Sequence, residues 1–212
     1  MLREQLRLYA ITDRKWLKEG ETLADRVEEA IRGGATIVQL REKQLKADDL
    51  KKLAISVKKI CNKYNVPLII NDDPYLARDI DADGVHVGQS DVAIEEARKI
   101  LGKDKLVGAT AKTVEQAKKA CEAGADYLGS GAVFGSTTKL NAIPMTKELL
   151  VEICNSVSIP VVAIGGIDIK NVDKLAGAPI AGVAVVSGIF ASDSVCSAAS
   201  ALSDKLCDMG IY

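Results

Sequence analysis

The chain contains few of the residues that build metal clusters, disulfide frameworks or base-stacking surfaces. Its 212 residues include one histidine, five cysteines and only 4% aromatic residues. Zinc needs clustered cysteine and histidine ligands, so the lone His86 argues against a zinc site. The odd number of cysteines, without any C-x-x-C spacing, argues against disulfides. We expect the cysteines to lie in helices and mostly to face the core as small apolar residues.

The sequence also lacks an excess of either charge. Its 28 basic and 29 acidic side chains give a formal net charge of -1 at pH 7. No global basic field is available to hold nucleic acid or an anionic membrane surface. We therefore expect neither kind of partner, and any anion-binding site must be local.

Long apolar segments are missing as well. The longest uncharged run, residues 175–192, is interrupted by Pro179, Gly182 and Gly188, so it indicates loop, buried strand and turn rather than a membrane span. The first residues, Met1 to Gln5, lack the apolar segment of a secretory signal. We expect a cytoplasmic protein.

What the chain does contain is a regular alternation of two kinds of segment. Eight short apolar runs rich in valine and isoleucine are separated by segments with helical periodicity, clearest over residues 50–61. Strands that are apolar at successive positions need cover on both faces, as in a parallel sheet. Eight such units predict an α/β fold, a (β/α)8 TIM barrel formed as a single domain by residues 1–212. The expected strands are residues 6–11, 36–41, 67–71, 84–87, 106–110, 127–133, 160–164 and 182–186.

An open, doubly wound sheet is the rival architecture. That fold usually carries G-x-G-x-x-G after its first strand, whereas here the first strand leads into Thr12-Asp13-Arg14. The barrel is favoured. A barrel places its chemistry at the carboxyl ends of its strands, so these ends are where functional residues should be sought.

The second strand ends in an amide and two cations. With a period of two, Gln39, Arg41 and Lys43 project to the same side, toward the barrel mouth. Such a set suggests an anion. The alternative is an ion pair with Glu42 or another nearby carboxylate.

Two aspartates follow adjacent strands. Asp72 comes after the third strand and Asp91 after the fourth, so their carboxylates can converge on one Mg²⁺ together with substrate phosphate oxygens. The cations Arg41, Lys43 and Lys139 nearby strengthen this interpretation. The alternative is that each aspartate caps a helix, and Asp91 does precede the helical stretch at residues 94–100.

Glycines mark the ends of the last two strands. Gly165-Gly166 follows the seventh strand and Ser187-Gly188 follows the eighth, where barrels often bind phosphate through backbone N–H groups. A plain tight turn is the alternative. His86 lies between Val85 and Val87 in an apolar strand, which favours a hydrogen-bonded structural role over that of a catalytic base.

Taken together, motifs spread over residues 8–189 resemble those of the thiamine-phosphate synthase family. Any single motif is weakly specific, and the set is highly specific. The matching stretches are LYAITD (8–13), VQLREK (38–43), IIND (69–72), ADGVHVGQSD (82–91), GADYLGSG (124–131), TTK (137–139) and VAIGGI (162–167).

The resemblance implies a Mg²⁺-dependent transferase of thiamine biosynthesis. Such an enzyme joins hydroxymethylpyrimidine pyrophosphate to thiazole phosphate and releases pyrophosphate and thiamine phosphate. Small-molecule substrates are thus the implied partners, and a homo-oligomer is compatible with the sequence. By resemblance, Gln39 faces the pyrimidine; Arg41, Lys43, Asn71, Thr110 and Lys139 contact the pyrophosphate; Asp72 and Asp91 carry Mg²⁺; Ser136 and Thr138 line the thiazole side; and Gly166, Val186 and Ser187 hold its phosphate.

Two positions depart from the family pattern. Thr110 stands where serine is usual, and Ser136 stands where threonine is usual. Both residues keep a hydroxyl that can donate a hydrogen bond. The reaction class is therefore unaffected, and the departures concern fine geometry.

Two other functions are compatible with the same fold. A thiazole tautomerase-like barrel would use a histidine just after the fifth strand, where this chain has Lys112. A non-catalytic barrel that binds a thiamine precursor and regulates a partner would have lost cations or carboxylates, and none is lost here. The residues favour the synthase.

Overall fold

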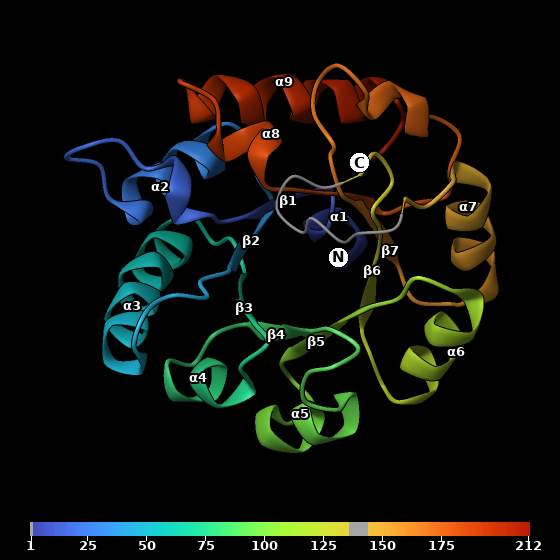
Figure 1. Cartoon of the computed structure of the whole chain (residues 1–212), viewed down its shortest axis with the longest axis horizontal. Helices are drawn as coiled ribbons and strands as arrows, with labels where there is room; N and C mark the ends of the chain where they lie inside the picture. Colours follow the sequence, from blue (N-terminus) through green and yellow to red (C-terminus); the bar gives the residue numbers. More distant parts are fainter. Residues whose placement is uncertain (1, 136–143) are drawn as a thin grey trace.

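The computed structural model describes residues 2–135 and 144–212. Eight parallel strands follow one another in chain order, and β8 pairs with β1 to close a barrel. The (β/α)8 fold predicted from the sequence is confirmed (Figure 1). The strands are β1 (Leu8–Ile11), β2 (Ile37–Leu40), β3 (Leu68–Asn71), β4 (Gly84–Val87), β5 (Leu106–Thr110), β6 (Tyr127–Gly131), β7 (Val161–Ile164) and β8 (Gly182–Val185).

Helices form a ring outside the strands, as Figure 1 shows. The longest are α3 and α9, which pack on either side of α2. The helices are α1 (Leu2–Gln5), η1 (Arg14–Trp16), α2 (Leu23–Arg32), α3 (Ala47–Lys63), α4 (Pro74–Asp79), α5 (Ile94–Leu101), α6 (Val114–Glu122), α7 (Lys147–Ser156), η2 (Val172–Leu175), α8 (Ser187–Phe190) and α9 (Val195–Asp208).

Alternating side chains of each strand supply two separate cores. On β1, Leu8 and Ala10 pack outward against the helices, whereas Tyr9 and Ile11 point into the barrel with Ile37 of β2. All four β1 side chains are buried, since the sheet is covered on both faces. This is why the strands are apolar at successive positions. The side chains that point into the barrel, at every second residue of a strand, continue as far as the barrel mouth.

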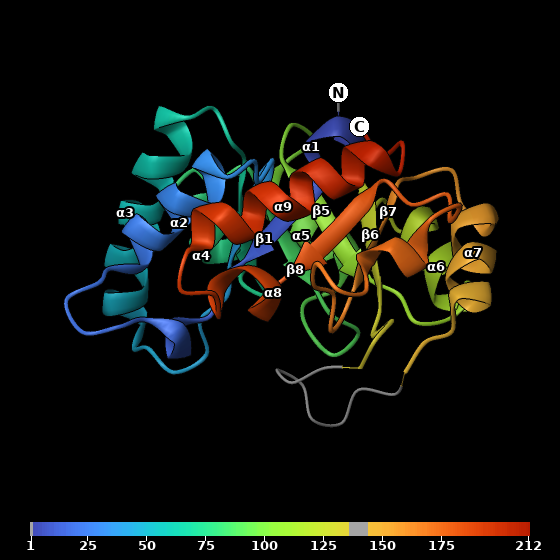
Figure 2. The ribbon, with the colours of Figure 1, turned by 90° about the horizontal axis from the view of Figure 1, so that it is seen from above.

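The short helix α1 covers the amino-terminal end of the barrel. Leu2 packs against the inner core, and the guanidinium of Arg3 donates to the carbonyl oxygen of Ile180 at 2.9 Å. Figure 2 shows α1 and both chain ends on one side of the molecule, opposite the loops that leave the carboxyl ends of the strands. The carboxyl end is therefore the end left open to ligands.

The alternation predicted from the sequence is wrong at the seventh unit. Between β7 and β8 the structure has the 3₁₀ turn η2 and no α-helix. Gly177 adopts a φ of +80°, and Pro179 follows two residues later without a backbone N–H, so turn residues interrupt this connection.

The cysteines lie in helices, as predicted, but are less buried than expected. Only Cys61 on α3 is fully buried, and Cys154 packs at the edge of the core. All five thiols are free. Separately, no helix among the described residues has both the length and the apolar character that a membrane crossing requires.

Candidate active site

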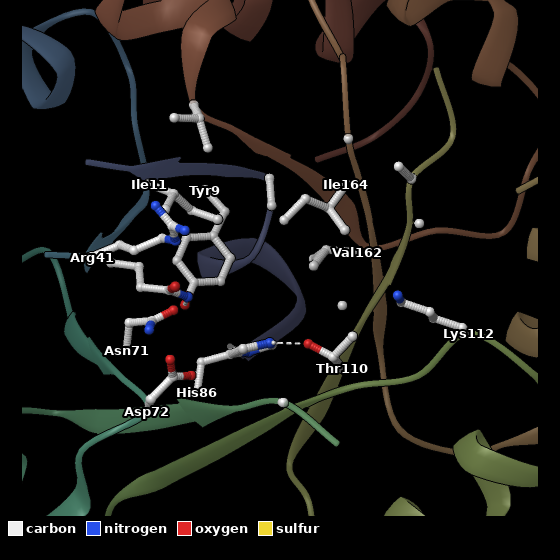
Figure 3. Close-up of a pocket in the computed structure, with 18 of the residues that line it drawn as sticks. Tyr9, Ile11, Arg41, Asn71, Asp72, His86, Thr110, Lys112, Val162 and Ile164 are labelled. Atoms are coloured by element: carbon white, nitrogen blue, oxygen red, sulfur yellow. Dashed lines mark hydrogen bonds between the residues drawn. The ribbon is translucent and has the colours of Figure 1, made fainter. Parts of the chain in front are cut away.

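A cavity of about 450 Å³ opens at the carboxyl ends of the strands. Its lining comes from all eight strands of the barrel, and Figure 3 shows the labelled side chains around it. The structure brings together the predicted residues Gln39, Arg41, Lys43, Asn71, Asp72, Asp91, Thr110, Gly166, Val186 and Ser187. The predicted residues Ser136, Thr138 and Lys139 lie outside the described part of the chain.

The backbone of Arg41 is fixed by a hydrogen bond, and its charged guanidinium is left for a ligand in the cavity. Its N–H donates to the hydroxyl of the buried Thr12 at 3.0 Å. Glu42, the expected alternative partner, instead pairs with Arg14 at 2.8 Å. In the described residues Arg41 has no carboxylate within the 4.0 Å of an ion pair. The ion-pair alternative therefore fails for Arg41, whose guanidinium lies over the cavity in Figure 3.

Lys43 does form an ion pair, with a residue of the site itself. Its ammonium lies 3.4 Å from Asp72 Oδ2, and the two side chains are 53% and 30% exposed. Exposed pairs of this kind contribute roughly 0–1 kcal/mol. An anionic ligand can therefore replace Asp72 as the partner of the Lys43 ammonium at a small cost in free energy.

The carboxylates of Asp72 and Asp91 meet at the mouth. The N–H of Asp72 donates to the carbonyl oxygen of His86 at 2.8 Å, and the residue takes a left-handed φ of +64°. Asp91 Oδ2 accepts a hydrogen bond from Gly88 N–H at 2.7 Å. Burial, together with the hydrogen bond and negative charge of Asp91, raises the pKa of Asp72 above its usual range.

Neither aspartate caps a helix. Asp73 is the residue that caps α4, since its side chain accepts from the N–H of Leu76 at 2.9 Å. The cap position of α5 is Ala93, which makes no side-chain bond. The helix-cap alternative is therefore wrong for both Asp72 and Asp91, and their carboxylates are directed to the site.

This donor set fits a hard cation. Asp72 and Asp91 offer carboxylate oxygens at one place, where burial and the charge of Asp91 raise the pKa of Asp72 and the ammonium of Lys43 lies 3.4 Å from Asp72 Oδ2. In residues 2–135 and 144–212, no group of three or more histidine, cysteine or acidic side chains forms a closed metal cage. Mg²⁺ is usually held by one or two carboxylates, with water and substrate phosphate supplying the rest. The described residues fit that pattern.

A row of hydrogen bonds crosses the floor of the cavity. Gln39 Nε2 donates to Tyr9 Oη at 2.8 Å, and Tyr9 Oη lies 2.8 Å from Tyr127 Oη. His86 Nδ1 lies 3.2 Å from Tyr127 Oη, and its Nε2 lies 3.1 Å from Thr110 Oγ1. Burial raises the pKa of both phenols above the usual range. His86 is hydrogen-bonded as predicted, but it also faces the cavity, which its apolar neighbours did not indicate.

The opposite wall is formed by the turns after β7 and β8. Gly166 has a φ of +62°, and a Cβ there would lie 2.6 Å from the carbonyl oxygen of Phe134. In the described chain, the N–H groups of Gly166 and Ser187 donate to no turn, loop or cap carbonyl. Both residues line the cavity, so their donors are available to an anion there.

Several lining residues were not found by reading the sequence. Tyr9 looked like core because it lies in an apolar strand, although the period-two pattern of β1 places it inward. Gln89 donates to the carbonyl oxygen of Thr110 at 2.6 Å, which ties the β4 loop to the end of β5. Lys112 lies two residues beyond Thr110, and its amine points into the cavity in Figure 3. The same two-residue spacing that indicated Arg41 and Lys43 would have found it.

Comparisons with known proteins agree with this geometry. The sequence model of one family, thiamine monophosphate synthase, matches residues 8–189. A thiamine-phosphate synthase of Fusobacterium nucleatum is 50% identical over 184 residues, which cover 87% of this chain and 89% of that protein. One of Clostridium acetobutylicum is 47% identical over 189 residues, 89% of each chain.

A solved structure is similar over the whole length. Thiamine phosphate pyrophosphorylase from Pyrococcus furiosus superposes with a TM-score of 0.91 at 34% sequence identity, covering 99% of both chains. The family match spans the barrel from β1 to α8, and the site residues of β2, β3 and β4 all lie inside it. The chain belongs to the thiamine monophosphate synthase family.

Proposed function

We propose that this protein is a Mg²⁺-dependent thiamine-phosphate synthase. It condenses hydroxymethylpyrimidine pyrophosphate with thiazole phosphate and releases pyrophosphate. The observation that carries the proposal is the convergence of Arg41, Lys43, Asp72 and Asp91 on one side of a single cavity. Two cations and a pair of carboxylates are what a metal-bound diphosphate needs.

The chemistry asks the site to stabilise a leaving group. As the bond from the pyrimidine methylene to oxygen breaks, negative charge grows on the diphosphate, and the amino-substituted ring delocalises the positive charge left behind. Arg41, Lys43 and the hydroxyl of Thr110 are arranged to meet that growing charge. One unit-charge contact at 4 Å is worth roughly 4 kcal/mol at an effective dielectric of 20, before desolvation.

Asp72 and Asp91 would hold Mg²⁺ beside the diphosphate, where the ion supplies charge neutralisation of the leaving oxygens. The ring nitrogen of the thiazole attacks as a neutral nucleophile and needs no general base. A site without a histidine and acid dyad therefore suffices. Asn71, next to Asp72, supports this side as an amide ligand for the diphosphate.

The second substrate would occupy the opposite wall. The N–H groups of Gly166 and Ser187 can hold its phosphate, with Val186 beside them, and Val162 and Ile164 provide an apolar surface for the thiazole ring. A cavity of about 450 Å³ is within the usual range for a small-molecule binding site. The roles of Ser136, Thr138 and Lys139 rest on the family resemblance.

A tautomerase would need neither the paired carboxylates nor the cations around them. The relatives that share about half of this sequence carry the synthase name, which supports the same choice. A regulatory, non-catalytic barrel has no reason to keep the full set of polar residues. The expected cytoplasmic location and the homo-oligomer stay predictions.

The test is release of pyrophosphate by the purified chain. We expect release only when both substrates and Mg²⁺ are present, with an equal amount of thiamine phosphate formed. Release from the pyrimidine substrate alone would indicate a hydrolase. No release under any combination would remove the synthase proposal.

A further inference from the structure

Five side chains on five different strands form one continuous hydrogen-bond chain beneath the proposed active site. It runs from Gln39 through Tyr9, Tyr127 and His86 to Thr110, with donor to acceptor distances of 2.8, 2.8, 3.2 and 3.1 Å. Gln39, Tyr9, His86 and Thr110 line the cavity, and Tyr127 is fully buried inside the barrel. The proposed reaction gives Tyr9, Tyr127 and His86 no chemical step.

Two glycines in the strands leave space for the side chains of this hydrogen-bond chain. A Cβ on Gly108 of β5 would overlap the ring of Tyr127, and a Cβ on Gly129 of β6 would lie 3.2 Å from His86 Cε1. A strand interior normally disfavours glycine because it gains no side-chain packing. Here the two glycines give the Tyr127 and His86 rings the space in which they meet.

Which atom donates in each bond of this hydrogen-bond chain, its proton order, follows from its first member, Gln39. The amide nitrogen of Gln39 can only donate, so Tyr9 Oη accepts its hydrogen bond. Each phenol has a single proton. If Tyr9 accepted from Tyr127 as well, its own proton would have no acceptor among the described residues, although Tyr9 is only 1% exposed. A buried donor without a partner is strongly disfavoured, so Tyr9 donates to Tyr127.

The same reasoning determines which ring nitrogen of His86 carries the proton. Tyr127 is fully buried, accepts from Tyr9, and therefore gives its own proton to His86 Nδ1. A neutral imidazole with an accepting Nδ1 carries its proton on Nε2 and donates it to Thr110 Oγ1. Burial keeps both phenols protonated at neutral pH by raising the pKa of each. The hydroxyl proton of Thr110 is then left for the cavity.

We infer that Tyr9, Tyr127 and His86 are positioning residues that fix the direction of every hydrogen bond in this row of side chains. As a result, Thr110 donates to the departing diphosphate, and Gln39 accepts from the pyrimidine. This inference rests on the proposed function only for the identity of the ligands. In the described residues Gln39 Oε1 accepts no hydrogen bond, so it can receive the exocyclic amine of the pyrimidine. The reverse order needs the opposite amide orientation of Gln39 and would turn Thr110 into an acceptor facing an anion.

The single histidine makes the order directly measurable. A tag-free sample labelled with ¹⁵N and ¹³C in histidine gives signals from His86 alone. Long-range ¹H–¹⁵N correlation spectra at neutral pH should show a neutral ring with Nε2 protonated and Nδ1 bare. A ring protonated on Nδ1, or on both nitrogens, would overturn the inference. This readout needs no substrate and no variant.

Variants then test which residue sets the order. Tyr127→Phe removes only the oxygen that donates to Nδ1, so the Nε2–H form should lose its dominance and a mixed population should appear. Tyr64→Phe, which removes a surface hydroxyl bonded to Glu28, is the matched control and should leave the His86 signals unchanged. An unaltered tautomer in a folded Tyr127→Phe protein would contradict the inference.

The functional consequence is measured with inorganic pyrophosphate and Mg²⁺ as the probe. Thr110→Val should weaken pyrophosphate binding by about tenfold, the usual scale for one hydrogen bond to a charged group, and Thr110→Ser should restore it. Tyr127→Phe should weaken binding in the same direction, by several fold. Equal affinities in all four proteins would contradict the inference. An inactive enzyme with an Nε2–H histidine would refute the proposed function and leave the proton order standing.

Discussion

The carboxylate of Asp91 lies close enough to that of Asp72 to raise its pKa further than burial alone does, although the two residues come from loops after different strands, β3 and β4. Two carboxylates in contact repel each other unless a proton or a cation lies between them. Lys43 compensates only part of this charge from 3.4 Å. The pair is therefore the part of the cavity with the strongest demand for a divalent cation.

Replacing one of these carboxylates should raise the Mg²⁺ requirement. Asp91→Asn keeps an oxygen that can accept from Gly88 N–H but removes the charge. We expect the Mg²⁺ concentration at half-maximal activity to rise on the order of tenfold or more, as loss of a charged contact costs about 1.5–3 kcal/mol. Asp104→Asn in an exposed loop is the control. If Asp91→Asn showed the wild-type dependence of activity on Mg²⁺ concentration, Asp91 would have a structural role and would not bind the metal.

Lys139 is expected to act on the chemical step. By the family resemblance it holds the diphosphate, whose charge is greatest as it departs. Lys139→Ala should therefore lower kcat more than it raises the KM for thiazole phosphate. Lys103→Ala, at an exposed position, should match the wild type. Unchanged turnover of the Lys139 variant would refute this role.

Lys112 should contribute to binding of a phosphorylated substrate. Its amine points into the cavity beyond Thr110, and its backbone N–H is tied to Gln116 Oε1 at 2.8 Å. We expect Lys112→Ala to raise the KM of one substrate by roughly tenfold, the effect of one charged hydrogen bond. Lys118→Ala, exposed on α6, provides the comparison. Identical KM values for both substrates would show that Lys112 only borders the site.

The turn at Gly166 can be tested against a matched glycine. Gly166 and Gly177 both have positive φ, at +62° and +80°, so alanine at either one is strained by about 1–3 kcal/mol. Only at Gly166 would the new Cβ also meet a backbone oxygen, that of Phe134. Gly166→Ala should raise the KM for thiazole phosphate, whereas Gly177→Ala should only lower Tm. Equal KM values in the two variants would argue against a phosphate at this turn.

Most of the fold could be predicted because the barrel imposes one rule on every strand. Each strand is covered on both faces, which produces the apolar runs, and the predicted bounds agree with the observed strands to within two residues. The seventh unit differs because its connection is set by turn residues such as Gly177 and Pro179, and not by a periodic pattern. Local patterns thus identify strands better than the connections between them.

The site was predictable where a strand and its following loop carry the signal. Gln39, Arg41 and Lys43 share one side by simple spacing, and all three line the cavity. The hydrogen bond between Tyr9 and Tyr127 joins residues 118 positions apart. No local pattern reports such a pair, because it exists only once the barrel has closed. The inward face of His86 was hidden for the same reason.

Single-turnover release of pyrophosphate by the wild type and by Arg41→Met tests the central claim most directly. With both substrates and Mg²⁺ saturating, the account predicts a rate lower by about 10²–10³-fold in the variant, the usual effect of removing one preorganised charge-stabilising group. Arg32→Met, on the exposed surface of α2, should keep the wild-type rate. Equal single-turnover rates for Arg41→Met and the wild type would contradict the claim that this cavity stabilises a departing diphosphate.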